Sequence, residues 1–178
     1  MARSGCTQDA ALLRPTSLCQ DGCMNLVQAS QGIELRSAKD VFSALAGTWE
    51  LSRTIGEWNF RGSAVFFVSG PDELRYEENG ILAKPDGADI PASRRYIYRY
   101  EAGRIAIYFD ERPARIFEIL DLKRAPNGNW EAQAEHACDP DHYASRYAFG
   151  PNAIVITHIV RGPRKGYEMV SNYRIVSR

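Results

Sequence analysis

The chain has 178 residues, and its 22 lysines and arginines are balanced by 22 aspartates and glutamates. This length predicts a single domain with a sizeable core, and the balanced charge gives no overall field that would recruit nucleic acid or an anionic membrane surface. The longest apolar runs are far shorter than the roughly 20 residues of a membrane-spanning helix. We therefore expect neither nucleic acid nor a membrane as a partner.

The first 36 residues mix Ser, Gln, Gly and Cys without sustained hydrophobic periodicity. We expect residues 1–36 to be a free tail, a lid over the body or an organellar presequence, because they lack the apolar segment of about 7 to 15 residues that a secretory signal needs. Three of the four cysteines, Cys6, Cys19 and Cys23, lie here. Since a secreted disulfide scaffold spreads its cysteines through the body, this distribution indicates a reducing, cytoplasmic setting.

A short amphipathic helix is expected next. Ser37 suits the N-cap, the apolar residues Val41, Phe42 and Leu45 recur at helical spacing, and Gly47 suits the C-terminal stop.

The rest of the domain, which we place at residues 37–178, alternates apolar and polar residues with period two. Turn residues interrupt this alternation about every ten positions, which predicts about ten strands. No second helical pattern separates the strands to carry parallel crossovers, so the sheet should be antiparallel. The simplest closures are an up-and-down barrel or a strongly bent sandwich.

Gly47-Thr48-Trp49 at the head of the first strand, with Arg174 in the last strand, resembles the lipocalin and calycin pattern. In those barrels the tryptophan plugs one end and the late arginine packs across its ring. The alternative is a plain buried tryptophan in another β fold.

A narrower resemblance covers Leu45 to Arg174. The segments LAGTWELSR, ELRYEENG, SRRYIYRY, EHACDPDHY and VRGPRKGYEMVSNYR are similar to an uncharacterised lipocalin-like family of bacteria and fungi, known as a domain of unknown function. This resemblance implies an all-β, lipocalin-like barrel and no established activity.

Strand parity selects inward-facing candidates. If Trp49 points into the barrel, Arg53 shares its face. A buried guanidinium must be paired, so Arg53 either clamps an oxygen of a ligand or meets a structural counter-ion. The counter-ion candidates are Glu77, Glu78 and Glu118.

His136 also faces inward by parity, because it shares a face with Trp130, Ala132 and Ala134. Its role is either general acid or base catalysis, or a core histidine bonded to a tyrosine or the backbone. Four potential metal ligands follow closely: Cys138, Asp139, Asp141 and His142. We expect no metal site, because strand alternation and the turn send these side chains in different directions.

Tyrosines recur on two of the expected strands. Tyr96 and Tyr98 share a face with Arg94, and Tyr143 shares a face with Tyr147. Such faces suit a pocket, because buried hydroxyls need partners that water or a ligand supplies. The alternative for the first pair is the outer face, where aromatic residues are good strand formers.

Two classes of function fit these observations. The first is a cofactor-independent isomerase, cyclase or dehydratase that acts on a small hydrophobic, oxygenated metabolite. The second is a non-catalytic carrier or sensor of an apolar ligand. We expect no cofactor, because the sequence has neither a phosphate-binding glycine loop nor a nucleophile elbow. The assembly should be a monomer or a homodimer, and the tail could instead recruit a protein partner.

For the enzyme, His136 with a carboxylate such as Glu118 would move a proton, while Arg53 or Tyr98 would polarise an oxygen. The predicted substrate-binding residues are Trp49, Tyr76, Tyr96, Tyr108, Phe117, Trp130, Tyr143 and Tyr147.

Overall fold

The structure is a computed structural model that describes residues 33–85, 87 and 89–178. Residues 1–32 of the proposed tail or lid therefore lie outside the described residues. The same holds for Cys6, Cys19 and Cys23, which belong to this segment. One helix is followed by strands throughout. The elements are α1 (Ala38–Leu45), β1 (Gly47–Ile55), β2 (Trp58–Gly70), β3 (Glu73–Ala83), β4 (Asp89–Glu101), β5 (Arg104–Phe109), β6 (Ile116–Leu120), β7 (Lys123–Arg124), β8 (Trp130–Cys138), β9 (Asp141–Phe149), β10 (Ala153–Arg161) and β11 (Gly166–Ser177).

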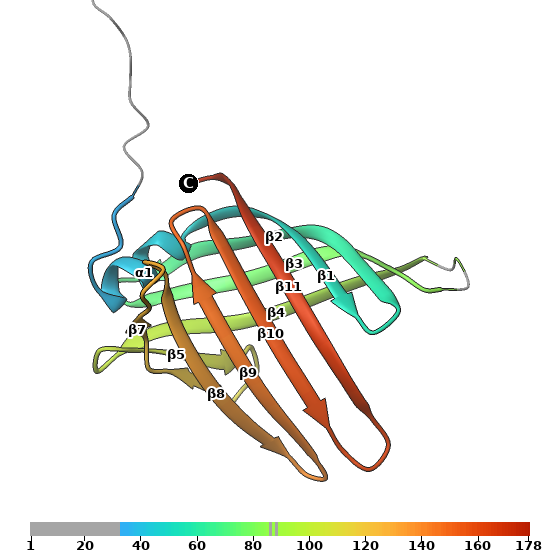
Figure 1. Ribbon diagram of the computed structural model, residues 1–178. Helices are drawn as coiled ribbons and strands as arrows, with labels where there is room; N and C mark the ends of the chain where they lie inside the picture. The colour runs from blue at the N-terminus through green and yellow to red at the C-terminus, as the bar shows by residue number, and fades with distance from the viewer. Residues whose placement is uncertain (1–32, 86, 88) are drawn as a thin grey trace, which may run out of the picture. The chain divides into compact units, whose positions relative to one another are not determined.

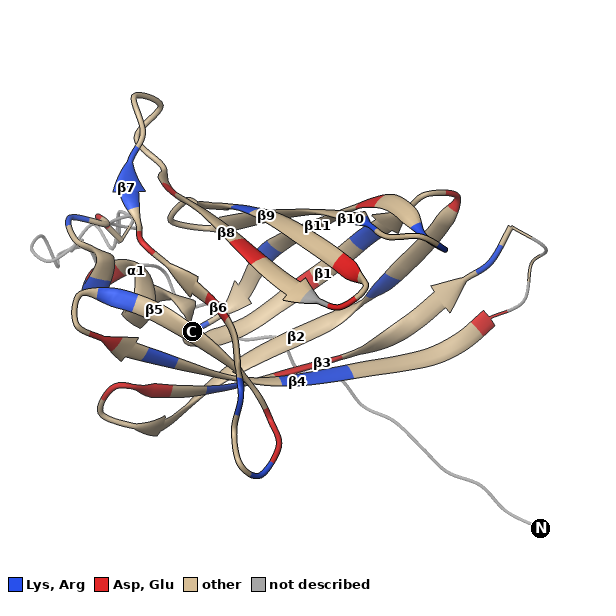
Figure 2. Ribbon diagram, turned by 90° about the horizontal axis from the view of Figure 1, so that it is seen from below, with Lys and Arg blue, Asp and Glu red and all other residues tan. Residues whose placement is uncertain are grey.

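The sheet is a single antiparallel meander in which β1 also pairs with β11 (Figures 1 and 2). Its order is β6-β5-β4-β3-β2-β1-β11-β10-β9-β8-β7. The sheet curls until β6 contacts β8, but no ladder joins these two strands within the described part of the chain. The predicted all-β antiparallel barrel is confirmed, with an open seam between β6 and β8. The strand beyond the expected ten is the two-residue β7.

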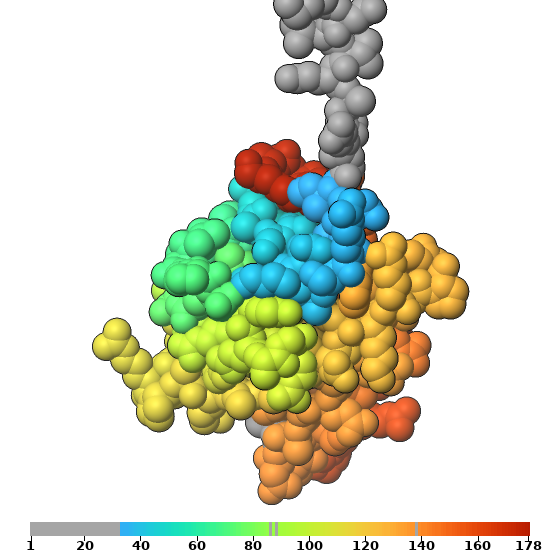
Figure 3. All heavy atoms as spheres, turned by 90° about the vertical axis from the view of Figure 1, so that its left-hand side faces the viewer, coloured from blue at the N-terminus to red at the C-terminus, as the bar shows by residue number. Residues whose placement is uncertain are grey.

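Helix α1 closes one end of the barrel, as the space-filling view shows in blue (Figure 3). It begins as predicted, because the Ser37 side chain accepts a hydrogen bond from the Asp40 N–H at 3.1 Å. Its apolar stripe of Val41, Phe42 and Leu45 is buried in the barrel core.

Alternation along β1 places Trp49 and Arg53 inside, while Glu50 is exposed. Trp49 is 1% exposed near α1, and its indole N–H donates to the Leu45 carbonyl at 2.9 Å. The expectation that Arg174 packs across the ring of Trp49 is wrong. Arg174 pairs with Glu50 on the outer face, because its neighbour Tyr173 takes the inward position, and Arg178 instead lies 5.9 Å from the Trp49 ring.

Two glycines allow β2 and β3 to pack closely beside the side chain of Arg53. Gly62 and Gly80 are register partners on β2 and β3. A Cβ atom on Gly80 would lie 2.5 Å from Cζ of Phe60, so only glycine leaves room for that ring. The Phe60 ring in turn lies 5.2 Å from the guanidinium of Arg53. The close approach at Gly80 therefore positions an aromatic surface beside a buried charge.

Candidate functional site

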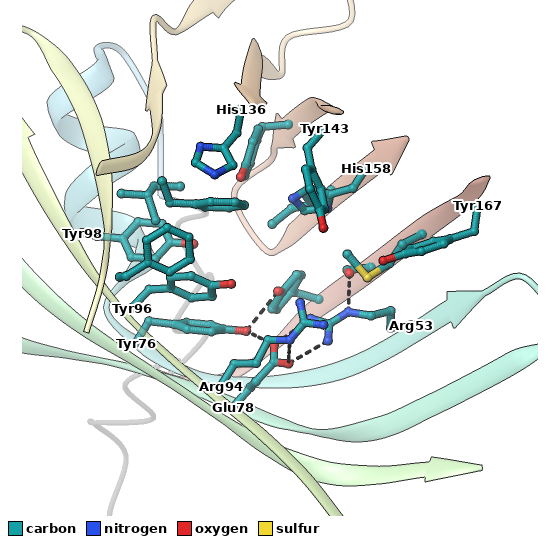
Figure 4. Close-up of a pocket in the computed structure, with 18 residues that line it drawn as sticks. Arg53, Tyr76, Glu78, Arg94, Tyr96, Tyr98, His136, Tyr143, His158 and Tyr167 are labelled. Atoms are coloured by element: carbon teal, nitrogen blue, oxygen red, sulfur yellow. Dashed lines mark hydrogen bonds and ion pairs between the residues drawn. The ribbon is translucent and has the colours of Figure 1, made fainter. Parts of the chain in front are cut away.

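The barrel encloses a cavity of about 310 Å³ on the side of the β8–β9 and β10–β11 hairpins (Figure 4). This volume falls within the range of small-molecule sites, about 300 to 1,000 Å³. The cavity is lined by Arg53, Tyr76, Glu78, Arg94, Tyr96, Tyr98, Ile107, Phe109, Phe117, His136, Tyr143, Tyr147, Ile156, His158, Tyr167, Met169, Ser171 and Tyr173.

A buried ion pair between Arg53 and Glu78 forms the polar wall of the cavity (Figure 4). Nη1 and Nη2 of Arg53 donate to the two carboxylate oxygens of Glu78 at 2.7 and 2.6 Å. Nε of Arg53 donates to Oγ of Ser171, its register partner on β11, at 2.7 Å. Of the three counter-ions considered for Arg53, the structure selects Glu78.

Two tyrosine hydroxyls extend this network. The Tyr76 hydroxyl donates to Oε2 of Glu78 at 2.5 Å and lies 3.1 Å from the hydroxyl of Tyr173. Burial disfavours the ionised form of Glu78, but hydrogen bonding and the charge of Arg53 outweigh it and lower the pKa of Glu78. Burial raises the pKa of Tyr76 well above its ordinary value. The wall therefore combines an ionised carboxylate with protonated phenols.

A second arginine, Arg94, stands beside this pair. Its Nε lies 3.8 Å from Oε1 of Glu78, which is an ion pair beyond hydrogen-bond distance, and its side chain is 44% exposed. Burial raises the pKa of Tyr96, and the charge of Arg94 and its hydrogen bond to the Tyr96 hydroxyl oppose that rise. Arg94 thus reaches from solvent into the cavity.

Two histidines lie across the cavity from the ion pair (Figure 4). The ring centroid of His136 lies 5.2 Å from that of Phe117 and 6.2 Å from that of Tyr143. The ring of His158 stacks on Phe117 at 6.3 Å. The imidazoles therefore belong to an aromatic wall that faces the charged one.

His158 is held neutral. Burial lowers its pKa to about 4, and the charges of Arg94 and Arg53 add to that effect. Within the described ranges, its Nδ1 is the one buried side-chain nitrogen or oxygen that has no hydrogen-bond partner. His158 is therefore an uncharged imidazole at neutral pH, with one nitrogen unsatisfied.

Glu118 lies next to the cavity without lining it. Its carboxylate is 2% exposed and accepts hydrogen bonds from the hydroxyls of Ser145, at 2.5 Å, and Tyr147. These contacts join β6 to β9 across the open seam of the barrel. Burial raises the pKa of Glu118, although both hydrogen bonds oppose the rise.

Replacing Glu118 with Gln is expected to stabilise the barrel at neutral pH, because an amide carries no charge to bury. With its pKa raised on folding, Glu118 contributes stability that is complete below its ordinary pKa of 4.5 and is lost as the pH rises through the folded value. Urea unfolding across this pH range should show the two proteins converging in acid. Glu131→Gln, on the exposed face of β8, is the matched control. A loss of stability in Glu118→Gln at neutral pH would contradict this assignment.

Residues 45–175 match a family described as Family of unknown function (DUF6314). The chain belongs to this family. The expected resemblance to a family of unknown function is therefore confirmed, and the structure confirms that this chain is a barrel. No curated protein sequence matches the DUF6314 chain significantly.

Solved structures show similarity in fold to the DUF6314 chain. An S-type phycobiliprotein lyase, CPES, from Guillardia theta has a TM-score of 0.51 and 12% identity, covering 80% of this chain and 93% of that one. A redesigned β-barrel, mFAP1, bound to DFHBI, has a TM-score of 0.42 and 12% identity, covering 79% of this chain and 99% of that one. The likeness to the lyase concerns the barrel fold alone.

Eight of the predicted site residues line the cavity of the DUF6314 chain. They are Arg53, Tyr76, Tyr96, Tyr98, Phe117, His136, Tyr143 and Tyr147. Of the two alternatives for Tyr96 and Tyr98, the structure therefore shows the inner face of the barrel. Trp130 packs near α1 instead, where its indole N–H donates to the Leu35 carbonyl at 2.9 Å.

The placement of Tyr108 in the site is wrong. Its hydroxyl donates to Glu101 at 2.9 Å and its ring lies 4.9 Å from the Arg99 guanidinium, on the outer face. The inward positions of β5 belong to Ile107 and Phe109, since adjacent residues point to opposite faces. Trp49, likewise, contributes to the core near α1 and does not line the cavity.

Several cavity residues were absent from the prediction. His158 had a usable signal, because Ile154, Ile156, His158 and Val160 alternate on one face of β10. Tyr167, Met169, Ser171 and Tyr173 alternate in the same way on β11. The sequence predicts Arg94 on the same face as Tyr96 and Tyr98, and the structure adds it to the lining of the cavity.

Among the described side chains, no group of three or more His, Cys, Asp and Glu residues is placed to hold a metal ion. The helix in the described part of the chain is too short to cross a membrane.

Proposed function

We propose that this barrel binds a hydrophobic, oxygenated metabolite and converts it by acid–base chemistry without a cofactor. An isomerisation, cyclisation or dehydration is the class of reaction that such a site would perform. The observation that carries the proposal is one cavity in which two imidazoles face a charged, hydrogen-bonded wall.

The lining supports binding of an apolar body. Phe117 stacks on Tyr96 at 5.5 Å, and Phe109 lies 5.2 Å from Phe117. Aromatic side chains of this kind supply large apolar contact areas to a flat ligand. Such walls would hold the metabolite in one reactive shape and exclude water from the reacting atoms.

His136 is the proposed proton-transfer group. His136 lines the cavity at half-buried depth beside Tyr143, and an imidazole placed in this way can act as a general acid or base. His158, with its lowered pKa of about 4, would serve as a neutral partner in the same wall. Arg53 acts as a positioning residue, because its Nε, Nη1 and Nη2 donate to Ser171 and Glu78 and thereby orient the carboxylate and Tyr76.

A carrier is the second candidate. The Arg53–Glu78 pair satisfies itself inside the barrel, so its presence does not require a reacting substrate. In that case the cavity would sequester the same kind of ligand and release it unchanged.

The enzyme and the carrier can be distinguished by incubating the purified protein with a small-molecule extract of cells and analysing the mixture by mass spectrometry. Wild-type protein should deplete one compound and accumulate an isomer or a dehydrated product. His136→Gln should slow this conversion by about 100-fold or more, the usual worth of a general acid or base. His142→Gln is the matched control, since His142 is 51% exposed and does not line the cavity. Retention of a compound without any product from any variant would support the carrier instead.

A further inference from the structure

We propose that the ligand is a monoanion, a flat hydrophobic molecule whose single carboxylate or enolate oxygen binds Arg94 at the polar wall of the cavity. This inference rests on the proposed function, because it names the chemical class of the molecule that the same cavity takes.

The charge balance of the cavity points to one negative charge. Its lining contains two arginines, Arg53 and Arg94, and one carboxylate, Glu78. Arg53 and Glu78 neutralise each other through two parallel hydrogen bonds. Arg94 is then the positive charge in the described lining that no carboxylate meets at hydrogen-bond distance, since its contact with Glu78 is 3.8 Å.

A lysine that contacts one of the lining tyrosines does not change this balance. Lys165, in the hairpin between β10 and β11, has its ammonium group 2.6 Å from the carboxylate of Asp141. It also donates to the Tyr143 hydroxyl at 3.3 Å. That pair is neutral as a unit, so Arg94 remains the charge that a ligand would meet.

Arg94 is also placed to meet a ligand. It precedes Tyr96 on the inward face of β4, and part of its side chain is exposed while it lines the cavity. A neutral ligand that fills the cavity would strip water from this guanidinium without replacing its hydrogen bonds, which is costly. A carboxylate would replace them with charge-assisted bonds, and the planar guanidinium suits its geometry.

The rest of the lining defines the body of the molecule. Tyr96, Phe117 and His158 present rings in succession, with Tyr96 and Phe117 at 22° and Phe117 and His158 at 29° to each other. Near-parallel rings favour a flat aromatic or conjugated ligand over a bulky aliphatic one. The polar group would then project toward Arg94 from the aromatic wall.

The test measures binding of three probes of equal size by isothermal titration calorimetry: 2-naphthoate, 2-naphthylmethanol and 2-naphthylmethylammonium. Wild-type protein should bind the carboxylate about tenfold more tightly than the alcohol, as one charged hydrogen-bonded contact predicts, and should bind the ammonium most weakly. Arg94→Gln should remove the preference for the carboxylate, because the carboxylate loses its charged partner, and the alcohol should bind at least as tightly as to wild-type protein, because no guanidinium loses its water.

Arg95→Gln is the matched control, because it removes the same charge one residue away from a side chain that is 67% exposed and does not line the cavity. It should retain the preference for the carboxylate. Equal affinity of wild-type protein for carboxylate and alcohol would overturn the monoanion inference and leave the binding function intact. An equal loss in both variants would overturn it as well, since a general field would then explain the preference. Failure of all three probes to bind would count against both proposals.

Discussion

Glu78→Gln is expected to lower the free energy of unfolding by about 3–5 kcal/mol, the usual cost of removing one partner of a buried ion pair. The substitution leaves the Arg53 guanidinium charged at a position where it is 6% exposed. It also weakens the acceptor that holds the Tyr76 hydroxyl. Urea unfolding should show a lower midpoint with an unchanged slope, because the surface exposed on unfolding stays the same.

Glu77→Gln provides the control for this loss, because it makes the same chemical change one residue away on the opposite face of β3. It should alter stability by no more than about 1 kcal/mol, because Glu77 is half-buried and lies outside the network of Arg53 and Tyr76. Replacing both Arg53 and Glu78 by Met should recover part of the loss, since an apolar pair buries no charge. Equal effects of the two Gln substitutions would contradict the role of the buried pair.

The second large effect is a pH dependence of the free energy of unfolding that His158 causes. Its folded pKa of about 4 lies below the ordinary value of 6.5, so the folded barrel binds this proton more weakly than the unfolded chain. The stability that follows is fully present above pH 6.5 and is lost as the pH falls through that value toward 4. At 1.36 kcal/mol for each pH unit, the loss from this residue is about 3 kcal/mol.

His158→Phe should remove this component, so that stability in acid declines less steeply than in wild-type protein. The substitution also eliminates the unsatisfied Nδ1, and phenylalanine can retain the stacking on Phe117. His142→Gln should keep the wild-type slope, because His142 is exposed. Urea unfolding at a series of pH values measures all three. Identical slopes for His158→Phe and wild-type protein would show that His158 is not buried in neutral form.

The parts of the fold that the sequence predicted are those with clean alternation. Along β1, the apolar residues Trp49 and Leu51 alternate with polar neighbours, and the same period of two extends the inward face to Arg53. The same reasoning placed His136, because Glu131 and Glu135 mark the wet face of β8. The start of α1 is set by the local chemistry of the Ser37 cap, and the helix ends at the C-cap Ala46, one residue before the predicted stop at Gly47.

The errors arose where alternation carried no information. On β5, apolar residues occupy both faces, so parity could not show that Tyr108 points outward. The arginine over Trp49 comes from Arg178 beyond the last strand, a position that strand alternation does not specify.

The sequence also could not specify which side chains contact each other across non-adjacent strands. Arg53 on β1 reaches Glu78 on β3 past the intervening strand β2, a diagonal contact that depends on the curl of the barrel. Sequence reasoning could therefore narrow the counter-ion to three glutamates without choosing among them. The seam contact of Glu118 with Ser145 and Tyr147 depends on the same curvature.

The central claim is that the interior of the barrel binds a small molecule, and Ile156 and Val155 allow a direct test. Ile156 lines the cavity, whereas its neighbour Val155 is 38% exposed on the outer face. Ile156→Trp should fill the cavity, and Val155→Trp should add the same side chain outside it.

The decisive measurement is mass spectrometry of the small molecules released on denaturation from wild-type protein and both variants, each purified from cells in parallel. We predict that one hydrophobic, oxygenated compound is released from wild-type protein and Val155→Trp and is depleted from Ile156→Trp. Release of the same compound in equal amount from folded Ile156→Trp would contradict binding inside the barrel.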